Sequence, residues 1–233
     1  MSASRSAPPA AAGGNNVAMV ERVFEGLRDE IVSGKLPPGT PLSRRQIAGQ
    51  FGTSYSPVIE AMVRLENAGL IEARPAQMAR VREVTLEAIY DDHTLREAYE
   101  TQAIRLACQH RTEAEIEELY GLAEAVEDRL TAADQQSGPR LDWQFHERIA
   151  QVSRSGVLQR EMARLGLLTR LRHAWMMVPL PLDRPQHHVR LVDHIRDRDV
   201  QAADALMREH VHSGLEQELR AFRLGLSSTP GAL

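Results

Sequence analysis

Four side chains in the second half of the chain have the types and the spacing of metal ligands. Asp142 and His146 are four residues apart, so a helix places them on one face. His188 and His210 each lie eleven residues from Asp199, one before it and one after it. Eleven helical residues span about 16 Å, so an antiparallel hairpin that turns near Asp199 brings both imidazoles to the same level. Three imidazoles and one carboxylate can bind Zn, Ni, Mn or Fe, and we predict such a site here.

The alternative interpretation of any single histidine is an ordinary core or surface side chain. All nine histidines of the chain lie at or after His93, and only the combined spacing of four residues favours a metal site. His194 follows His188 by six residues and falls on about the opposite face of that helix, so we expect a structural or interfacial role for it. Cys108, the single cysteine, cannot form an internal disulfide, and we expect a buried small residue in a reducing cytoplasm.

Charge divides the 233 residues into two parts, although the net charge of the whole chain is only -4. Residues 1–85 contain ten Lys and Arg and eight Asp and Glu, a net charge of +2. Residues 86–233 contain 18 Lys and Arg and 24 Asp and Glu, a net charge of -6. A hydrophobic content of 42% with 26% charged residues excludes a wholly disordered chain. An aromatic content of 4% argues against a stacking surface for single-stranded nucleic acid. No apolar run approaches the roughly 20 residues of a membrane-spanning helix, so we expect no membrane association.

Residues 17–85 predict three helices followed by a small hairpin. Residues 17–33 carry apolar side chains at intervals of three and four, Ser43 is a good N-cap for a helix over 43–51, and a third helix runs to Ala68 before Gly69. Alternation over 70–74 and 79–82 predicts two strands. This order is that of a winged helix-turn-helix. Residues 1–16, rich in Ala, Pro, Ser and Gly, are expected to form a disordered tail.

Helical periodicity continues through the rest of the chain, so the predicted fold class is mainly α. The predicted helices are residues 86–110, 113–132, 141–152, 156–177, 187–196 and 199–224, with breaks at 111–112, 134–139 and 178–185. We therefore expect an antiparallel all-helical bundle over 86–225 and a tail over 226–233.

A helix-turn-helix reads DNA with the first turn of its last helix. That turn is residues 54–57 here, and two arginines lie on the helix before it. The alternative is that Ser56-Pro57 only begins a helix, with Pro at its first position, and that the two arginines form an exposed face. The candidate DNA-contacting residues are Arg44, Arg45, Ser54, Tyr55, Ser56, Pro57, Ile59, Arg74, Gln77 and Arg80.

Four blocks within residues 17–85 resemble the GntR family of bacterial repressors. They are LPPGTPL (36–42), IAGQFG (47–52), SYSPVIEAM (54–62) and RLENAGL (64–70). The resemblance implies a winged helix that binds a double-stranded DNA operator. Tyr55 and Ile59 stand where the family usually carries its two base-reading arginines, and Met78 replaces the customary wing-tip glycine. Since Ile59 suits a thymine methyl group, we expect an operator unlike the usual family site.

The second part resembles the effector-binding FCD domain of FadR-type GntR regulators over residues 86–224. Three residues depart from the usual family pattern: His187 replaces a Glu, His194 an Ala and Val157 an Asn. The positions that hold the metal in many FCD domains are matched by Asp142 and His146 in Asp-x-x-Phe-His, by His188 and by His210.

In such domains the metal helps to hold a small carboxylate effector. Arg96, with Glu100 four residues on, matches an Arg/Glu pair of the first FCD helix, which implies that Arg96 contacts the effector. The alternative is a surface salt bridge. Whether Arg172 or His173 also faces the pocket stays open. Core packing is expected for Trp143, Trp175, Met176 and Met177.

The leading interpretation is a cytoplasmic, homodimeric transcription regulator that responds to a small organic acid. We expect repression, with activation as the alternative. One competing hypothesis is a helical metalloenzyme, but there is no His-Glu-x-x-His, and Glu147 next to His146 points elsewhere on its helix, so we expect no enzymatic activity. The other is a regulator in which the metal is purely structural.

Overall fold

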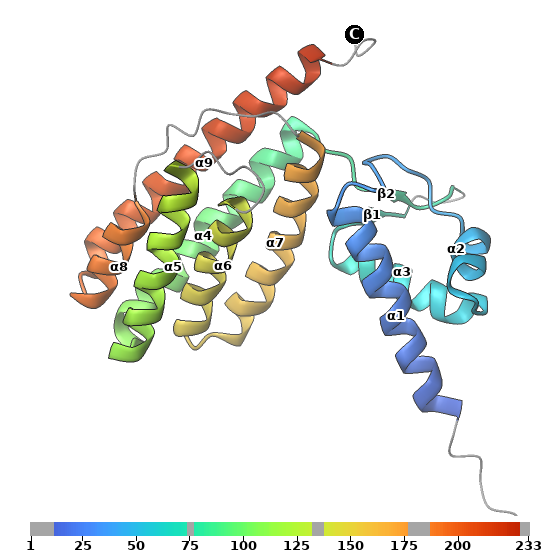
Figure 1. The fold of residues 1–233 in the computed structure, drawn as a ribbon, viewed down its shortest axis with the longest axis horizontal. Coiled ribbons are helices and arrows are strands. Elements are labelled where there is room, and N and C mark those ends of the chain that lie inside the picture. The colour runs from blue at the N-terminus through green and yellow to red at the C-terminus, as the bar shows by residue number, and fades with distance from the viewer. Residues whose placement is uncertain (1–11, 74–76, 132–137, 177–186, 229–233) are drawn as a thin grey trace, which may run out of the picture. The chain divides into compact units, whose positions relative to one another are not determined.

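The computed structural model of the protein describes residues 12–73, 77–131, 138–176 and 187–228 (Figure 1). The chain folds into two compact units, residues 1–83 and 84–233. Helices make up most of the described chain, and the only strands found there form one two-stranded sheet. The predicted fold class, a helix-turn-helix followed by an all-helical unit, is confirmed.

The first unit contains α1 (Ala12–Val32), α2 (Arg44–Phe51), α3 (Tyr55–Asn67), β1 (Ile71–Glu72) and β2 (Arg80–Val81). Helices α1 and α2 both pack on α3. Helix α1 begins at Ala12, inside the segment 1–16 that we expected to be a disordered tail. The side chains of α1 that are buried begin at Val20, and a helix fixed there gains one backbone hydrogen bond for each further residue at low cost.

Capping and one close approach fix the position of α2. The Ser43 side chain accepts a hydrogen bond from the Gln46 amide, as its predicted N-cap role requires, and Gly52 ends the helix in the left-handed region at φ 61°. A Cβ on Gly26 of α1 would lie 2.7 Å from the Phe51 ring. Only glycine therefore fits where α1 passes the end of α2.

The hairpin is shorter than the alternation of residues 70–74 and 79–82 predicts. Strands β1 and β2 pair antiparallel with Ile71 opposite Val81 and Glu72 opposite Arg80. An isolated bridge between Pro41 and Arg80 extends the pairing on the other side of β2. Only Ile71 and Val81 of the four paired residues are buried, so little apolar surface holds further residues in the ladder.

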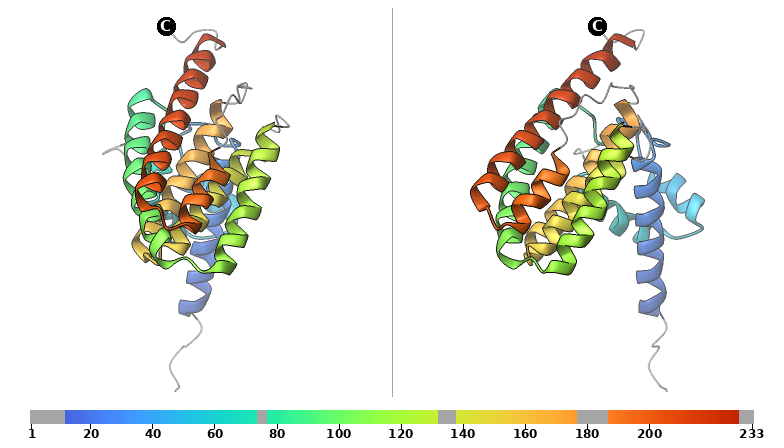
Figure 2. Two further views of the ribbon diagram at one scale, coloured as in Figure 1. Left: turned by 90° about the vertical axis from the view of Figure 1, so that its left-hand side faces the viewer. Right: turned by 60° about the vertical axis from the view of Figure 1, so that its left-hand side comes forward.

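The second unit contains the other six helices of the described chain (Figures 1 and 2). Each of the six predicted helices is present, with bounds that differ by at most four residues. Helix α9 packs along α4 and against α8, while α6 packs on α4, α5 and α7. None of the described helices is long and apolar enough to cross a membrane. The six are α4 (Leu86–His110), α5 (Glu113–Thr131), α6 (Gly138–Val152), α7 (Gly156–Met176), α8 (His188–Arg196) and α9 (Val200–Ser228).

The core of this unit brings α6 and α7 into close contact. A Cβ on Gly166 of α7 would lie 2.0 Å from Nε1 of Trp143, so Trp143 occupies the space that any larger side chain would need. Trp143 and Met176 are buried as expected, and Met177 lies outside the described residues. The expectation for Trp175 is wrong, because its side chain is 51% exposed. An unbroken apolar run in a sequence does not show which of its members turn outward.

The turn between α8 and α9 falls at residues 197–199, as the hairpin geometry requires. Arg198 adopts the left-handed region at φ 57°, and its guanidinium donates to the backbone oxygens of Cys108 and Gln109, both at 2.8 Å. Asp199 caps α9 by accepting from the Ala202 amide at 3.0 Å. Cys108 itself is buried, as expected. This turn sets the register between α8 and α9.

Candidate functional site

The four predicted metal ligands converge inside the second unit. Asp142 and His146 come from α6, His188 is the first residue of α8, and His210 lies on α9. All four side chains are buried, and their candidate ligand atoms lie within 4.8 Å of one another. Nε2 of His146 is 3.0 Å from Nε2 of His210. Nε2 of His188 is likewise 3.0 Å from Oδ1 of Asp142.

This arrangement fits a divalent cation. A zinc ion binds imidazole nitrogen and carboxylate oxygen at about 2.0–2.2 Å, so its ligands lie up to about 4.4 Å apart, close to the span found here. Burial, followed by the neighbouring His146 and His188, holds the pKa of His210 well below its usual value. His210 is therefore neutral at pH 7, and neutral imidazole is the form that binds metals.

A carboxylate holds the other side of one imidazole. Nδ1 of His146 lies 2.8 Å from Oε2 of Glu100, and both side chains are buried. Burial alone would raise the pKa of Glu100, but Arg96 and His146 outweigh it and keep that pKa well below its usual range. A carboxylate in this position fixes the orientation and tautomer of a metal-binding histidine.

Arg96 completes this chain of contacts. Its Nε donates to Oε1 of Glu100 at 2.8 Å, and its guanidinium lies 5.3 Å from the centre of the Trp143 ring. Arg96 and Glu100 are only 5% and 2% exposed, so the alternative of a surface salt bridge is wrong.

His188 has an acidic neighbour too. Oε1 of Glu127, on α5, lies 4.0 Å from Nδ1 of His188 and accepts a hydrogen bond from the Val189 amide at 3.1 Å. Glu127 thus ties α5 to the first turn of α8, next to a candidate ligand.

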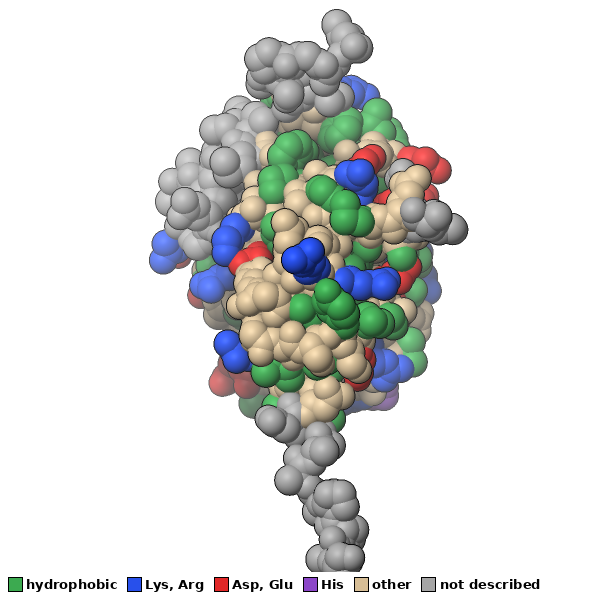
Figure 3. Space-filling view, turned by 90° about the vertical axis from the view of Figure 1, so that its right-hand side faces the viewer, with side chains coloured by type: hydrophobic (Ala, Val, Ile, Leu, Met, Phe, Trp, Pro, Cys, Tyr) green, Lys and Arg blue, Asp and Glu red, His purple; other side chains and the backbone are tan. Residues whose placement is uncertain are grey.

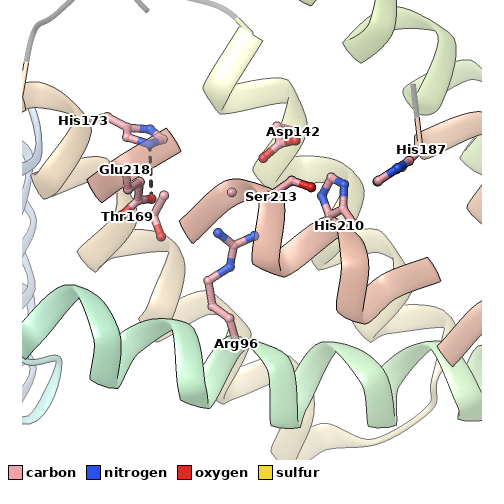
Figure 4. A pocket seen from close by; sticks show the side chains of 9 residues that line it. Arg96, Asp142, Thr169, His173, His187, His210, Ser213 and Glu218 are labelled. Atoms are coloured by element: carbon pink, nitrogen blue, oxygen red, sulfur yellow. Dashed lines mark ion pairs between the residues drawn. The ribbon is translucent and has the colours of Figure 1, made fainter. Parts of the chain in front are cut away.

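A pocket opens beside the four candidate ligands (Figure 4). Figure 4 shows His210 and His187 toward one end of it, and His173, Thr169 and Glu218 toward the other. The Arg96 side chain rises from α4 and points its guanidinium into the space between them. The lining residues are Arg96, Asp142, Thr169, His173, His187, His210, Ser213, Gly214 and Glu218.

Arg172 lies behind the far end of the pocket and does not belong to the described lining. Its Nε donates to Oε2 of Glu218 at 2.8 Å, and its Nη1 lies 2.5 Å from Oδ2 of Asp92. Its Nη2 donates to the Thr169 hydroxyl at 3.2 Å. The question left open between Arg172 and His173 is thus answered: His173 lines the pocket, and Arg172 supports Glu218.

Sequence reasoning missed four residues of the pocket lining, Thr169, Ser213, Gly214 and Glu218. Asp92, Arg96 and Glu100 follow one another at intervals of four on α4, and all are buried. Gly214 and Glu218 continue the same interval from His210 on α9. A four-residue interval of polar side chains was the available signal, but in a sequence it is indistinguishable from a solvated helix face. His194 does not line the pocket and is partly buried in α8.

The face of α3 that the sequence assigns to DNA is exposed. Tyr55, Ile59 and Val63 are 54%, 42% and 50% exposed and follow one another at intervals of four, so they form one apolar line along the helix. Arg44 and Arg45 are exposed in the first turn of α2. Figure 3 views the molecule from the side on which α2 lies in Figure 1, and basic side chains lie among hydrophobic ones in that view.

The remaining predicted DNA contacts divide into three groups. Ser54, Ser56 and Gln77 are exposed, and Arg80 is exposed with its Nη1 donating to the Gly39 oxygen at 2.9 Å. Arg74 lies outside the described residues.

Pro57 requires a correction. It is buried in the first turn of α3, whose N-cap is Ser54 rather than Ser56. A proline is tolerated there because the first amides of a helix have no partner within it. We therefore remove Pro57 from the candidate DNA contacts.

Comparison with known families and relatives agrees with this architecture. Residues 19–81 match the family described as bacterial regulatory proteins, gntR family, and residues 91–213 match the FCD domain. A Paenarthrobacter nicotinovorans protein named "Probable D-xylose utilization operon transcriptional repressor" is 31% identical over 78% of this chain and 80% of its own. The HTH-type transcriptional repressor RspR of Escherichia coli is 24% identical over 87% of this chain and 90% of its own.

Two solved structures share the fold. McbR/YncC of E. coli superimposes with a TM-score of 0.70 at 21% identity, over 88% of this chain and 98% of the other. A transcriptional regulator described as GntR from Rhodococcus sp. RHA1 gives a TM-score of 0.70 at 23% identity, over 88% and 99% of the two chains.

Proposed function

The chain belongs to the GntR family of bacterial regulatory proteins and carries an FCD domain, and from this premise we propose a metal-dependent, acid-responsive repressor. Its first unit binds a double-stranded operator, and its second unit binds a divalent metal together with a small carboxylate metabolite. The effector then changes operator binding. As a regulator of transcription, the protein works in the cytoplasm.

The observation that carries the metal part of this proposal is the convergence of four buried ligands from three helices. The residues that would hold the ion are Asp142, His146, His188 and His210. When bound, the ion supplies positive charge and an open coordination position for an effector oxygen. Glu100 lies against His146 and orients its ring. The Arg96 guanidinium points into the pocket beside the candidate ligands.

The effector acts by binding the operator-competent and operator-incompetent states with different affinity. Arg96 supplies donors for the effector carboxylate, while its own Nε stays on Glu100. Because Arg96 and the candidate ligands lie on α4, α6, α8 and α9, a bound acid would add contacts among four helices that already meet through buried polar side chains. Binding of the acid therefore increases the population of the helix arrangement that has the higher affinity for it.

For operator binding, the exposed residues Tyr55, Ile59 and Val63 of α3 support a recognition helix that uses apolar contacts. Ile59 packs against thymine methyl groups, Tyr55 donates to a base or phosphate, and Arg44 and Arg45 contact phosphates. Loss of two bidentate arginine–guanine contacts removes about 1–3 kcal/mol of discrimination each, which thymine contacts replace only in part. Two copies of the chain, related by a two-fold axis, bind the two half-sites of an operator.

A screen of metabolite acids on metal-loaded and chelated protein tests the proposal, with melting temperature and operator affinity both measured. We expect an acid that raises the melting temperature only in the metal-loaded protein and changes operator affinity at the same concentration. His210→Ala should abolish both effects, and His212→Ala, which changes an exposed histidine of the same helix, should preserve them. A His210→Ala protein that still binds the acid normally would remove the metal from the mechanism and leave it a structural role.

A further inference from the structure

We propose that Met78 inserts into the minor groove of the operator, where its side chain partly unstacks one base step and bends the duplex. The inference rests on the proposed function for the existence of an operator, and it adds a contact that reads the deformability of the DNA. It depends on an apolar side chain that the first unit exposes outside its recognition helix.

Met78 lies in the segment that joins β1 to β2, and its side chain is 54% exposed. The customary residue at this wing tip is glycine, which brings only backbone close to DNA. Methionine adds a long, unbranched and polarisable side chain that adapts to irregular apolar spaces. This chain therefore carries at its wing tip a group that can enter a base stack and that a glycine cannot supply.

The backbone next to Met78 is held on both sides of β2. Strand β1 pairs with one side of β2. On the other side, the Val81 amide donates to the Thr40 oxygen at 3.0 Å, and the Leu42 amide donates to the Ala79 oxygen at 2.8 Å. Ala79 directly follows Met78, so the anchored chain reaches the residue next to it. A side chain that pushes base pairs apart needs such a fixed base.

Met78 points to the same side of the wing as Arg80. Side chains of an extended chain alternate between its two faces. Val81 is buried, Arg80 is exposed, and Met78, two residues before Arg80, is exposed as well. Gln77, the neighbour of Met78, is also exposed. An arginine and an amide are the side chains that contact DNA phosphates and sugars, so the surroundings of Met78 fit a duplex.

Exposed large hydrophobic side chains of the first unit lie mainly on the recognition helix and the wing. Among the described residues they are Val17 of α1, Tyr55, Ile59 and Val63 of α3, and Met78. When α3 occupies the major groove, the hairpin beside it meets the adjacent minor groove, where hydrogen-bond readout is degenerate. Met78 has no donor for such readout. Its way of contributing is insertion, by which apolar side chains kink a duplex from the minor groove.

Insertion makes the operator sequence matter at a step to which Met78 makes no hydrogen bond. The pyrimidine–purine steps TA and CA/TG unstack easily, whereas A-tracts are stiff. We therefore expect one of these flexible steps at a fixed distance from the thymine that Ile59 contacts. Since two copies bind two half-sites, the step should occur twice, at symmetric positions.

The test uses 2-aminopurine, an adenine analogue whose fluorescence rises when it leaves the base stack. The full-length protein first selects a duplex from random sequences, and the analogue then replaces each adenine of that duplex in turn. We expect the fluorescence to rise at the flexible step of each half-site when the protein binds. Energy transfer between dyes on the two ends of the duplex should increase at the same time, because the DNA bends.

Three variants locate the effect at the wing. Met78→Ala should abolish the rise in fluorescence and weaken binding at least fivefold, at an unchanged melting temperature because the side chain is exposed. Met78→Leu keeps a large apolar side chain and should retain both the rise and the affinity. Val17→Ala removes an exposed apolar side chain from α1 of the same unit and should behave like the wild type.

A mismatch at the flexible step separates insertion from a contact on the surface of the groove. A mispaired base costs less to unstack. The wild type should therefore bind the mismatched duplex at least fivefold more tightly than the paired one. Met78→Ala inserts nothing, so its affinities for the two duplexes should differ by less than twofold.

Four results would overturn the inference: no rise at any adenine, a rise that persists in Met78→Ala, equal losses in Met78→Leu and Met78→Ala, or equal gains of the wild type and Met78→Ala from the mismatch. In each of them the protein still binds the selected duplex, so the proposed operator binding stands. If the full-length protein selects no duplex at all, the proposed function fails and this inference fails with it.

Discussion

Nδ1 of His146 lies 2.8 Å from Oε2 of Glu100, and the opposite nitrogen of the same ring faces His210 at 3.0 Å. The carboxylate thus stands on the far side of the imidazole from the other candidate ligands. A proton on Nδ1, the nitrogen that faces this carboxylate, would leave Nε2 available as a ligand atom. Glu100 is also the residue that connects His146 to Arg96, and hence the four candidate ligands to the pocket.

Glu100→Gln should lower the affinity for Zn²⁺ by about 10–100-fold, the usual range when a residue behind a metal-binding histidine is changed. The amide cannot supply the negative charge that fixes the ring. Zinc affinity is measured by competition with a chelating dye. Glu97→Gln, at an exposed position on the same helix, is the control and should bind zinc like the wild type. Equal affinity in the two variants would show that Glu100 does not orient His146.

Acid should destabilise the chelated protein below pH 6.5. Burial, together with His146 and His188, holds the pKa of His210 well below 6.5 in the folded protein. The unfolded chain therefore binds a proton that the folded chain does not, and the free energy of unfolding falls as the pH drops through 6.5. The pKa of the buried His93 is also lowered and acts in the same direction.

Melting temperatures measured in chelator at pH 7.5, 6.5 and 5.5 should show this loss. The carboxylates Glu100 and Glu218, whose pKa values are lowered, add to it only below about pH 4.5, where the unfolded chain protonates them. His210→Gln should flatten the profile between pH 7.5 and 5.5, and His212→Gln should reproduce that of the wild type. A melting temperature that is constant or higher at pH 5.5 would contradict the assignment.

Gly166→Ala should destabilise the second unit by about 1–3 kcal/mol, the usual cost of overpacking a core. The new Cβ would lie 2.0 Å from Nε1 of Trp143, so the indole must move, and it stands beside Asp142 and under Arg96. Zinc affinity should fall with stability. Gly121→Ala is the matched control, because nothing lies within 4 Å of its Cβ, and it should be neutral or stabilising. Equal unfolding free energies in urea for both variants would refute this account of the packing.

The proposed phosphate contacts of Arg44 and Arg45 predict how operator binding depends on salt. Replacing Arg44 and Arg45 by Ala should weaken binding to all duplexes and reduce the slope of log affinity against log salt by about one for each lost phosphate contact. Arg22→Ala, which removes an exposed arginine from α1 of the same unit, is the control. Fluorescence anisotropy at several salt concentrations measures both. An unchanged slope in the double variant would exclude these two arginines from the phosphate contacts.

The apolar line of α3 predicts sensitivity to single methyl groups on the DNA. Binding sites selected from random duplexes should differ from the usual family half-site and contain thymine opposite Ile59. Replacing that thymine by uracil removes only the methyl group and should weaken binding by the wild type, but not by Ile59→Ala. Selection of the usual family half-site, or indifference of the wild type to uracil, would refute this mode of reading.

Local spacing was enough to predict the helices and to place Asp142 with His146 and His188 with His210, whereas the meeting of these two pairs was implied by the family resemblance. His188 and His210 required only helical rise and a turn near Asp199 to be placed at one level. The polar pocket could not be predicted, because Glu218 and Arg172 are 46 residues apart and their pairing depends on how α7 and α9 pack. The burial of Arg96 was equally undecidable, since an Arg/Glu pair at four residues is the same in a core and on a surface.

Helix α4 is the first helix of the second unit, and its residue Arg96 lines the pocket. It begins at Leu86, after the four residues that follow β2, and runs without interruption to His110. Arg96 is ten residues from that beginning, about 15 Å of continuous helix. Only residues 82–85 separate β2 from this helix, so we expect a ligand that displaces α4 at Arg96 to act first on the segment that joins the two units.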